Sequence, residues 1–200
     1  MKTKLIFFIL ISGFLFAQNP KDFINKVQSK FNSISNFTAK FSQTFYTAHG
    51  TEGGKANGNF YYKKKNKFLV ELSNNIISSN GNTVWNYDKR FKRVVISNFN
   101  DDPTSFSLEK FIFAYPQLCK AEILKDENGA LLLTPKDNDL QFKRVKIWKT
   151  ADNLISKMEL VDIGDLKYSF SFSDIKINQD LQDSKFEFQI PQGTQVIDLR

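Results

Sequence analysis

The 200-residue sequence contains a single cysteine, Cys119, and a single histidine, His49. One cysteine cannot form a disulfide within the chain, and it cannot supply the thiolates of a structural zinc or iron–sulfur site. One histidine excludes a two-histidine metal site and most catalytic groups that depend on histidine. The side chains on which metal-dependent and nucleophilic enzymes rely are therefore largely missing, and we expect no cofactor.

Long hydrophobic runs are also scarce, and the one that is present lies at residues 5–16. It is too short to span a bilayer comfortably, two lysines precede it, and the small Ala17 follows it. This pattern is typical of a secretory signal peptide over residues 1–17, with residues 18–200 as one exported domain. The alternative is an uncleaved membrane anchor. No cysteine follows directly after the run, so we do not expect lipid attachment to this chain.

Aromatic side chains are abundant, with 21 Phe, 6 Tyr and 2 Trp. The first predicted element after residue 17 is a helix, because Asn19 suits an N-cap and Pro20 suits the first helical position. Apolar residues then recur at helical spacing from Ile24 to Ile34, with lysines on the opposite face. Such a helix either covers a sheet or binds a membrane surface, and we favour the first.

From Asn36 onward the apolar period changes to two, which predicts strands. Turn signals follow about every ten residues, including a glycine-rich turn over 49–58. A second amphipathic helix is predicted over 101–117, begun by Asp102 and Pro103 and ended by Pro116. One helical turn is expected at 183–186, before a closing extended segment at 188–199. The predicted strands are 37–45, 59–62, 67–72, 76–79, 83–87, 91–97, 121–125, 130–134, 142–149, 154–162 and 166–177.

Short strands at this spacing favour an antiparallel sheet that curls. Its concave face is predicted to be mostly aromatic and aliphatic, with few polar groups to orient a polar substrate. Two arrangements remain open at this point. Either the face is a core packed under the two helices, or it is an apolar cavity with a helical lid.

Five motifs, in order along the chain, resemble those of the LolA family. The resemblance extends over nearly the whole chain after the signal, from about Ile24 to Asp198. They are ISNFTAKFSQ (34–43), GNFYYK with NKF (58–63 and 66–68), SNGNTVWNY (79–87), LLTPK (132–136) and KFEFQIPQG (185–193).

The resemblance implies a mainly β fold with helices, an unclosed antiparallel β-barrel of about eleven strands with a helical lid over a hydrophobic concave face. It also implies a monomeric periplasmic carrier that binds the acyl chains of outer-membrane lipoproteins. An inner-membrane ABC transporter of the LolCDE type would supply the cargo, and an outer-membrane LolB-like receptor would take it in some bacteria. Carrying lipid requires no nucleophile, acid, base or metal, which agrees with the residues that are scarce.

The sequence departs from the family at the end of the second strand, where the family commonly has an Arg-Pro pair and this chain has Lys64-Lys65. The family's arginine bonds the lid helices across the cavity mouth in the empty state. Lys64 keeps the charge but lacks the planar guanidinium, so an equivalent latch should be weaker and less directional. We predict Lys64 as the lid latch.

The lipid-binding cavity wall is predicted from residues at two-residue spacing on single strand faces. This set is Phe37, Phe41, Phe60, Tyr62, Phe68, Val70, Phe170 and Phe172.

Other functions are less compatible with these residues. The net charge is +7, and basic groups occur at 63–67, 89–93 and 143–146. They fall at strand ends and turns of an exported chain, so we interpret them as solvent-exposed charges at the rim of the sheet. The next alternative is that they contact anionic lipid headgroups or an acidic protein, and nucleic acid is the least favoured partner. Charged residues interrupt the strands, which argues against a transmembrane barrel.

An enzyme would have to rely on isolated groups such as Glu71, Glu159 or His49, which show no catalytic spacing. The main competing function is a carrier or sensor of another lipid or glycolipid on the same fold.

Overall fold

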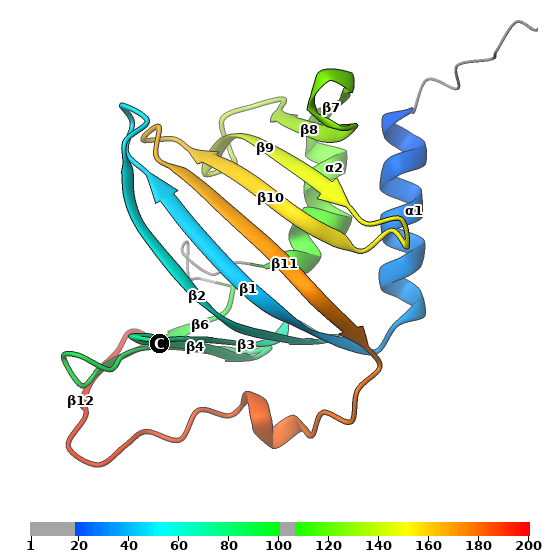
Figure 1. Ribbon diagram of the computed structural model, residues 1–200. Helices are drawn as coiled ribbons and strands as arrows, with labels where there is room; N and C mark the ends of the chain where they lie inside the picture. Colours follow the sequence, from blue (N-terminus) through cyan, green and yellow to red (C-terminus); the bar gives the residue numbers. More distant parts are fainter. Residues whose placement is uncertain (1–18, 101–106) are drawn as a thin grey trace, which may run out of the picture.

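Twelve strands form one curled sheet in the order β12-β6-β5-β4-β3-β2-β1-β11-β10-β9-β8-β7 (Figure 1). The computed structural model describes residues 19–100 and 107–200. The predicted signal peptide and the predicted helix start at Asp102 and Pro103 lie outside these ranges. No helix within them is long and apolar enough to cross a bilayer.

The strands are β1 (Asn36–Tyr46), β2 (Glu52–Lys63), β3 (Lys67–Leu72), β4 (Asn75–Asn80), β5 (Thr83–Asp88), β6 (Arg93–Asn98), β7 (Cys119–Leu124), β8 (Ala130–Pro135), β9 (Phe142–Lys149), β10 (Ile155–Asp162), β11 (Lys167–Ile177) and β12 (Gln195–Asp198).

Strands β12 and β7 are the two edges, so the sheet curls without closing, as predicted. All pairings are antiparallel except that of β12 with β6, which is parallel. The sequence predicted about eleven antiparallel strands, so the parallel β12 is a correction. The reason is the route of the C-terminal segment, which crosses under the sheet before it reaches β6 (Figure 1). Register shifts in β1 and β10 mark bulges, which increase the local twist and curl of a sheet.

The predicted glycine-rich turn at 49–58 is also corrected, because β2 begins at Glu52. The actual turn covers residues 47–51, and Gly54 and Gly58 pair with β1. A side chain at Gly53 would overlap the Phe45 ring, and one at Gly58 would collide with the Glu71 carbonyl. These glycines therefore allow close packing inside a strand rather than a change of chain direction.

Helix α1 (Pro20–Ser33) forms as predicted, with the Asn19 side chain accepting the Lys21 N–H at 2.9 Å. Its Phe23, Val27 and Phe31 are buried against the sheet, so the helix covers the concave face rather than remaining free. The alternative of a helix left exposed for membrane binding is therefore not the arrangement in this structure.

A second helical segment covers residues 108–118 and combines a π-helical turn, η1 (Lys110–Ala114), with α2 (Tyr115–Leu118). Pro116 was predicted to end this helix, but the helix continues to Leu118. Proline normally collides with the carbonyl four residues earlier. Here the wide turn changes the bonding pattern, because Tyr115 donates its N–H to the Lys110 carbonyl five residues back. Both helices lie on the same side of the sheet (Figure 1).

The convex face is crossed by the C-terminal segment, residues 178–194, which includes the 3-10 turn η3 (Asp183–Phe186). Phe186 is fully buried, and its carbonyl accepts a hydrogen bond from Ser78 Oγ at 2.8 Å. Farther along, Phe188 packs on Tyr87 with ring centroids 5.3 Å apart. A second, smaller core therefore forms on the outside of β4–β6 and fixes the lower half of the sheet.

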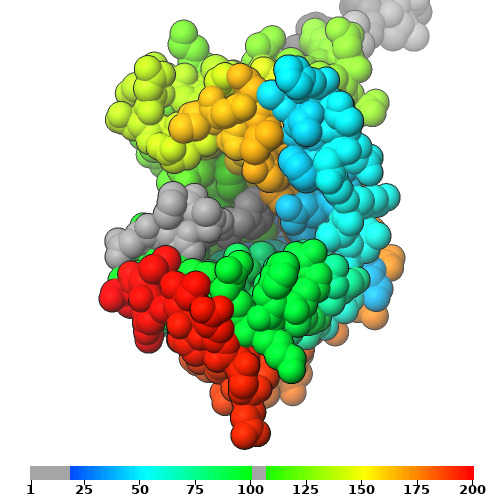
Figure 2. Space-filling model, turned by 90° about the vertical axis from the view of Figure 1, so that its left-hand side faces the viewer, coloured from blue at the N-terminus to red at the C-terminus, as the bar shows by residue number. Residues whose placement is uncertain are grey.

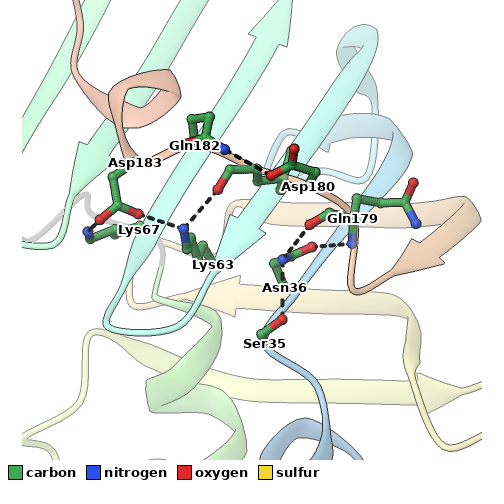
Figure 3. Close-up of polar contacts among 9 residues, drawn as sticks. Ser35, Asn36, Lys63, Lys67, Gln179, Asp180, Gln182 and Asp183 are labelled. Atoms are coloured by element: carbon green, nitrogen blue, oxygen red, sulfur yellow. Dashed lines mark hydrogen bonds and ion pairs between the residues drawn. The ribbon is translucent and has the colours of Figure 1, made fainter.

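Polar contacts attach this C-terminal segment to the start of β1 and the end of β2 (Figure 3). The Asn36 side chain donates to the Gln179 carbonyl and accepts the Gln179 N–H. Asp183 forms ion pairs of 2.7 Å with both Lys63 and Lys67, and these hydrogen bonds lower the pKa of the Asp183 carboxyl to about 2.

This lowered pKa predicts a pH-dependent stability. Because the folded-state pKa of Asp183 lies below the ordinary value of 3.8, its contribution should be complete above about pH 4 and lost as the pH falls toward 2. We expect Asp183→Asn to lower the urea midpoint at pH 7, with the difference from the parent vanishing near pH 2. Asp180→Asn is the matched control, because Asp180 accepts a hydrogen bond from Gln182 and forms no ion pair with any described residue. A constant difference across this pH range would contradict the prediction.

Candidate functional site

The predicted wall residues all lie on the concave face. The strand registers align Phe37 with Tyr62, Phe41 with Phe172, and Tyr62 with Phe68, so these side chains share one side of the sheet. Phe170 is half-buried, and the other seven are at most 7 % exposed.

Aromatic rings form a continuous layer across β2, β1 and β11. The Phe60 centroid lies 5.2 Å from that of Phe172 and 5.6 Å from that of Phe37, and Phe41 lies 5.5 Å from Phe172. Edge-to-face and offset contacts at these distances are the favourable arrangements for aromatic pairs. Helix α1 completes the layer through Phe31, 5.6 Å from Tyr62.

The helices fill the part of the concave face that they cover. The two interior gaps between the helices and the sheet have volumes of about 0 and 10 Å³, too small for an acyl chain. Of the two arrangements that the sequence left open, the packed core describes this conformation. Within this covered part of the face, a lipid chain would have room only if the helices moved away from the sheet.

Beyond the helices, the same face is only partly covered. Phe45, Tyr168 and Phe170 are half-buried and stacked, with centroids 6.3 and 6.4 Å apart along the row. Leu72 and Ile77 lie on the same face in β3 and β4 and are also only partly buried. Figure 2 shows a hollow on this side, between the cyan β1–β2 hairpin and the green strands β4–β6. The apolar face therefore extends from a filled end to an open end.

The β2–β3 turn, residues 64–66, holds α1. Lys64 Nζ donates to the carbonyl of Asn32, in the last turn of α1, at 2.8 Å, and the Lys64 N–H donates to the Ser35 carbonyl. The lysine that the sequence singled out thus contacts a helix carbonyl at the rim of the concave face. Whether this contact controls lid opening stays a prediction.

The same turn holds the segment 108–118 through Glu109, a residue that the sequence analysis missed. The Glu109 carboxylate accepts the Tyr62 hydroxyl at 2.6 Å and the Asn66 N–H at 3.0 Å, while Ser107 Oγ donates to the Asn66 side chain. Burial and the adjacent Glu109 raise the pKa of Tyr62, so Tyr62 remains the hydrogen donor. Tyr62 therefore forms part of both the apolar wall and the polar anchor.

The groups considered for catalysis do not come together. His49 lies in the exposed turn 47–51, Glu71 contacts Tyr61, and Glu159 pairs with Lys157. Cys119 is buried, and burial raises its pKa, which disfavours the reactive thiolate. Within residues 19–100 and 107–200, no cluster of three or more potential metal ligands occurs.

A hollow of about 410 Å³ lies on the convex face rather than under the helices. It is open to solvent, and its walls combine the polar Thr38, Lys40 and Asn59 with the apolar Ala39 and Ile175. It lies outside the continuous aromatic layer of the concave face, which remains the candidate site.

Comparison with known proteins agrees with this geometry. The profile of the family "Outer membrane lipoprotein carrier protein LolA" matches residues 32–189. The chain belongs to the LolA family. A relative named outer-membrane lipoprotein carrier protein from Azotobacter vinelandii is 26% identical over 203 residues, covering 94% of this chain and 96% of the relative.

A second relative of the same name, from Francisella philomiragia, is 31% identical, with 97% of this chain and 95% of the relative covered. Among solved structures, an uncharacterized conserved protein from Thermus thermophilus has a TM-score of 0.55 at 14% identity, covering 90% of this chain and 99% of that one. This likeness concerns the fold alone. The recognition of the LolA family from the five sequence motifs is confirmed.

Within this LolA-family fold, Glu109 lies in the predicted amphipathic helix, which was predicted from its apolar residues alone. The one available signal was an acidic side chain in the middle of a predicted amphipathic helix. Its partners Tyr62 and Asn66 are more than 40 residues away in sequence. Only the fold could identify them.

Proposed function

We propose that this protein is a periplasmic carrier that binds the acyl chains of outer-membrane lipoproteins on its concave face. The main support is the continuous aromatic layer on that face, covered by two helices that polar contacts hold at the β2–β3 turn. The names of its relatives support the lipoprotein cargo. Delivery would proceed from an ABC transporter of the LolCDE type to the outer membrane, in some bacteria through a LolB-like receptor.

The physical chemistry explains why such a carrier is needed. Each buried methylene contributes about 0.8 kcal/mol, so one acyl chain of about sixteen carbons is held in a membrane by about 10 kcal/mol. Two or three chains would not cross an aqueous space unaided. A carrier must offer comparable apolar area and then release it, which requires a cover that closes again over the empty face.

The filled conformation supplies the driving force for release. When the helices lie on the sheet, they occupy the volume that the cargo would need, so the closed empty state and the loaded state exclude each other. Anything that stabilises the closed state lowers the apparent affinity for cargo. No step requires a catalytic group, and we propose a monomer without enzymatic activity.

Binding of a fluorescent lipopeptide to the purified mature protein tests this function. Trp85 and Trp148 alternate with the inward-facing Val84 and Ile147 and so point to the convex side, which makes ligand anisotropy a better readout than protein emission. Saturable binding that a triacylated lipopeptide competes for more strongly than a glycolipid supports the proposal. Preference for the glycolipid would favour the alternative of a carrier for another lipid, and no saturable binding would contradict both.

Lys64 offers a direct test of the lid latch. We expect Lys64→Leu to bind lipopeptide more tightly and to transfer it more slowly to acceptor liposomes, because the closed state loses the contact with Asn32. A neutral-acceptor contact of this kind contributes about 1 kcal/mol, or about fivefold in affinity. Lys64→Arg should have the opposite effect. Lys65→Leu, at the neighbouring exposed position in the same turn, is the control. If both Lys64 variants transfer cargo as the parent does, Lys64 is only a solvated charge.

A further inference from the structure

The turn between β5 and β6 combines an exposed aromatic ring with a cluster of cations. Residues 89–93, Lys-Arg-Phe-Lys-Arg, are all exposed, and Phe91 is 66% exposed. A lone exposed phenylalanine is common on protein surfaces and needs no explanation. Here, however, the guanidinium carbons of Arg90 and Arg93 lie 5.3 and 5.9 Å from the centre of its ring.

The turn is held in a defined shape. The Asp88 carboxylate accepts the N–H groups of Arg90 and Phe91 and pairs with the Arg90 side chain at 2.9 Å. Lys89 Nζ donates to the carbonyls of Leu72 and Ser73 in the neighbouring turn. The ring of Phe91 is therefore presented by an ordered hairpin, which lowers the entropy lost when a partner binds it.

The charge of this turn is not neutralised. Asp88 offsets Arg90, but neither Lys92 nor Arg93 forms an ion pair with any described residue. Residues 88–93 carry one carboxylate and four cations, a net charge of +3. An apolar ring among several cations matches the interface of an anionic bilayer, where the ring enters the acyl boundary and the cations meet phosphate groups.

We infer that the β5–β6 turn is a docking surface for a bilayer rich in anionic phospholipid. This surface is separate from the concave face. The turn, coloured green, projects at the left of Figure 1, and the hollow seen in Figure 2 opens on that same side. Docking through this turn would therefore bring the open end of the apolar face toward the membrane.

Sedimentation of the empty protein with vesicles tests the inference and requires no lipoprotein. We expect binding to vesicles of phosphatidylglycerol and phosphatidylcholine, and weak binding to phosphatidylcholine alone. Binding should fall markedly between about 50 and 300 mM salt, because salt screens exposed charges. Phe91→Ser should weaken binding about tenfold, since most of the ring would leave water at the interface. The double variant Lys92→Gln/Arg93→Gln should weaken it about twentyfold at low salt.

Ile163→Ser is the matched control. Ile163 is 59% exposed at the tip of the β10–β11 hairpin, but its neighbours in that turn are Asp162, Gly164 and Asp165 instead of cations. This variant should bind vesicles as the parent does. All altered positions are exposed, so circular dichroism should show unchanged folding.

Equal binding of parent and Phe91 variants, or binding that neither salt nor phosphatidylglycerol affects, would overturn the inference. Failure of the parent protein to bind vesicles that contain phosphatidylglycerol would overturn it as well. Because the assay reads attachment of the empty protein, a failure here leaves the lipopeptide titration unaffected, and a failure of lipopeptide binding leaves this result unaffected.

Discussion

We expect Phe41→Glu to abolish binding of a fluorescent lipopeptide. Phe41 is 5% exposed at the centre of the concave face, where its ring contacts Phe60, Phe170 and Phe172. A carboxylate at this point would lie against acyl chains, at a cost of several kcal/mol unless it remains hydrated. A loss of about 3 kcal/mol, for example, would reduce affinity on the order of a hundredfold.

The same change also weakens folding, because the empty protein buries this position as well. Phe170→Glu separates the two effects, since Phe170 is half-buried and lies toward the open end of the face. Its control is Ser171→Glu, which adds the same charge to the adjacent, opposite-facing position of β11. We expect Phe170→Glu to lose lipopeptide binding with little change in the urea midpoint, and Ser171→Glu to keep both. If both Phe variants fold and bind lipopeptide like the parent, the cargo does not occupy this face.

The second large effect is expected at Glu109. Glu109→Ala removes the acceptor for both Tyr62 and Asn66 and so releases the segment 108–118 from the β2–β3 turn. Hydrogen bonds to a charged group contribute about 1.5–3 kcal/mol each. Destabilising the closed state by one such bond should raise the apparent lipopeptide affinity about tenfold or more and slow release to acceptor liposomes.

Tyr62→Phe should produce a smaller change in the same direction, because Asn66 still donates to Glu109. Glu122→Ala, at an exposed position of β7, is the control for loss of a carboxylate. The urea midpoint of empty Glu109→Ala should fall while its affinity for lipopeptide rises. A fall in both quantities would mean that Glu109 only supports the fold and does not regulate access to the concave face.

Together the Lys64 and Glu109 contacts attach both helical segments to the sheet at the position where Lys64-Lys65 stands in this chain. Lys64 bonds one helix through a backbone carbonyl, and Tyr62 and Asn66 bond the other through Glu109. Both sets of contacts come from the end of β2 and the turn that follows it. Double variants of Lys64 and Glu109 would therefore report whether the helices open independently, in which case their effects on affinity add.

Local sequence patterns by themselves determined much of this protein. The Asn19 cap and the helical apolar spacing define α1, and the two-residue spacing assigns the inward face of β1, β2, β3 and β11. These features depend on neighbours in sequence, because side-chain direction follows directly from helical or extended geometry. The five ordered motifs then sufficed to recognise the LolA family.

Only the tertiary structure decided the remaining features. Residues 52–58 look like a turn because glycine is common in turns, yet pairing with β1 and the space required by Phe45 and the Glu71 carbonyl make them a strand. Pro116 looks like a helix end, yet the preceding π turn accommodates it. Likewise, the contacts of Glu109 and the parallel pairing of β12 with β6 join residues far apart in the chain. Periodicity specifies which way a side chain points, but what it meets there depends on how distant segments pack.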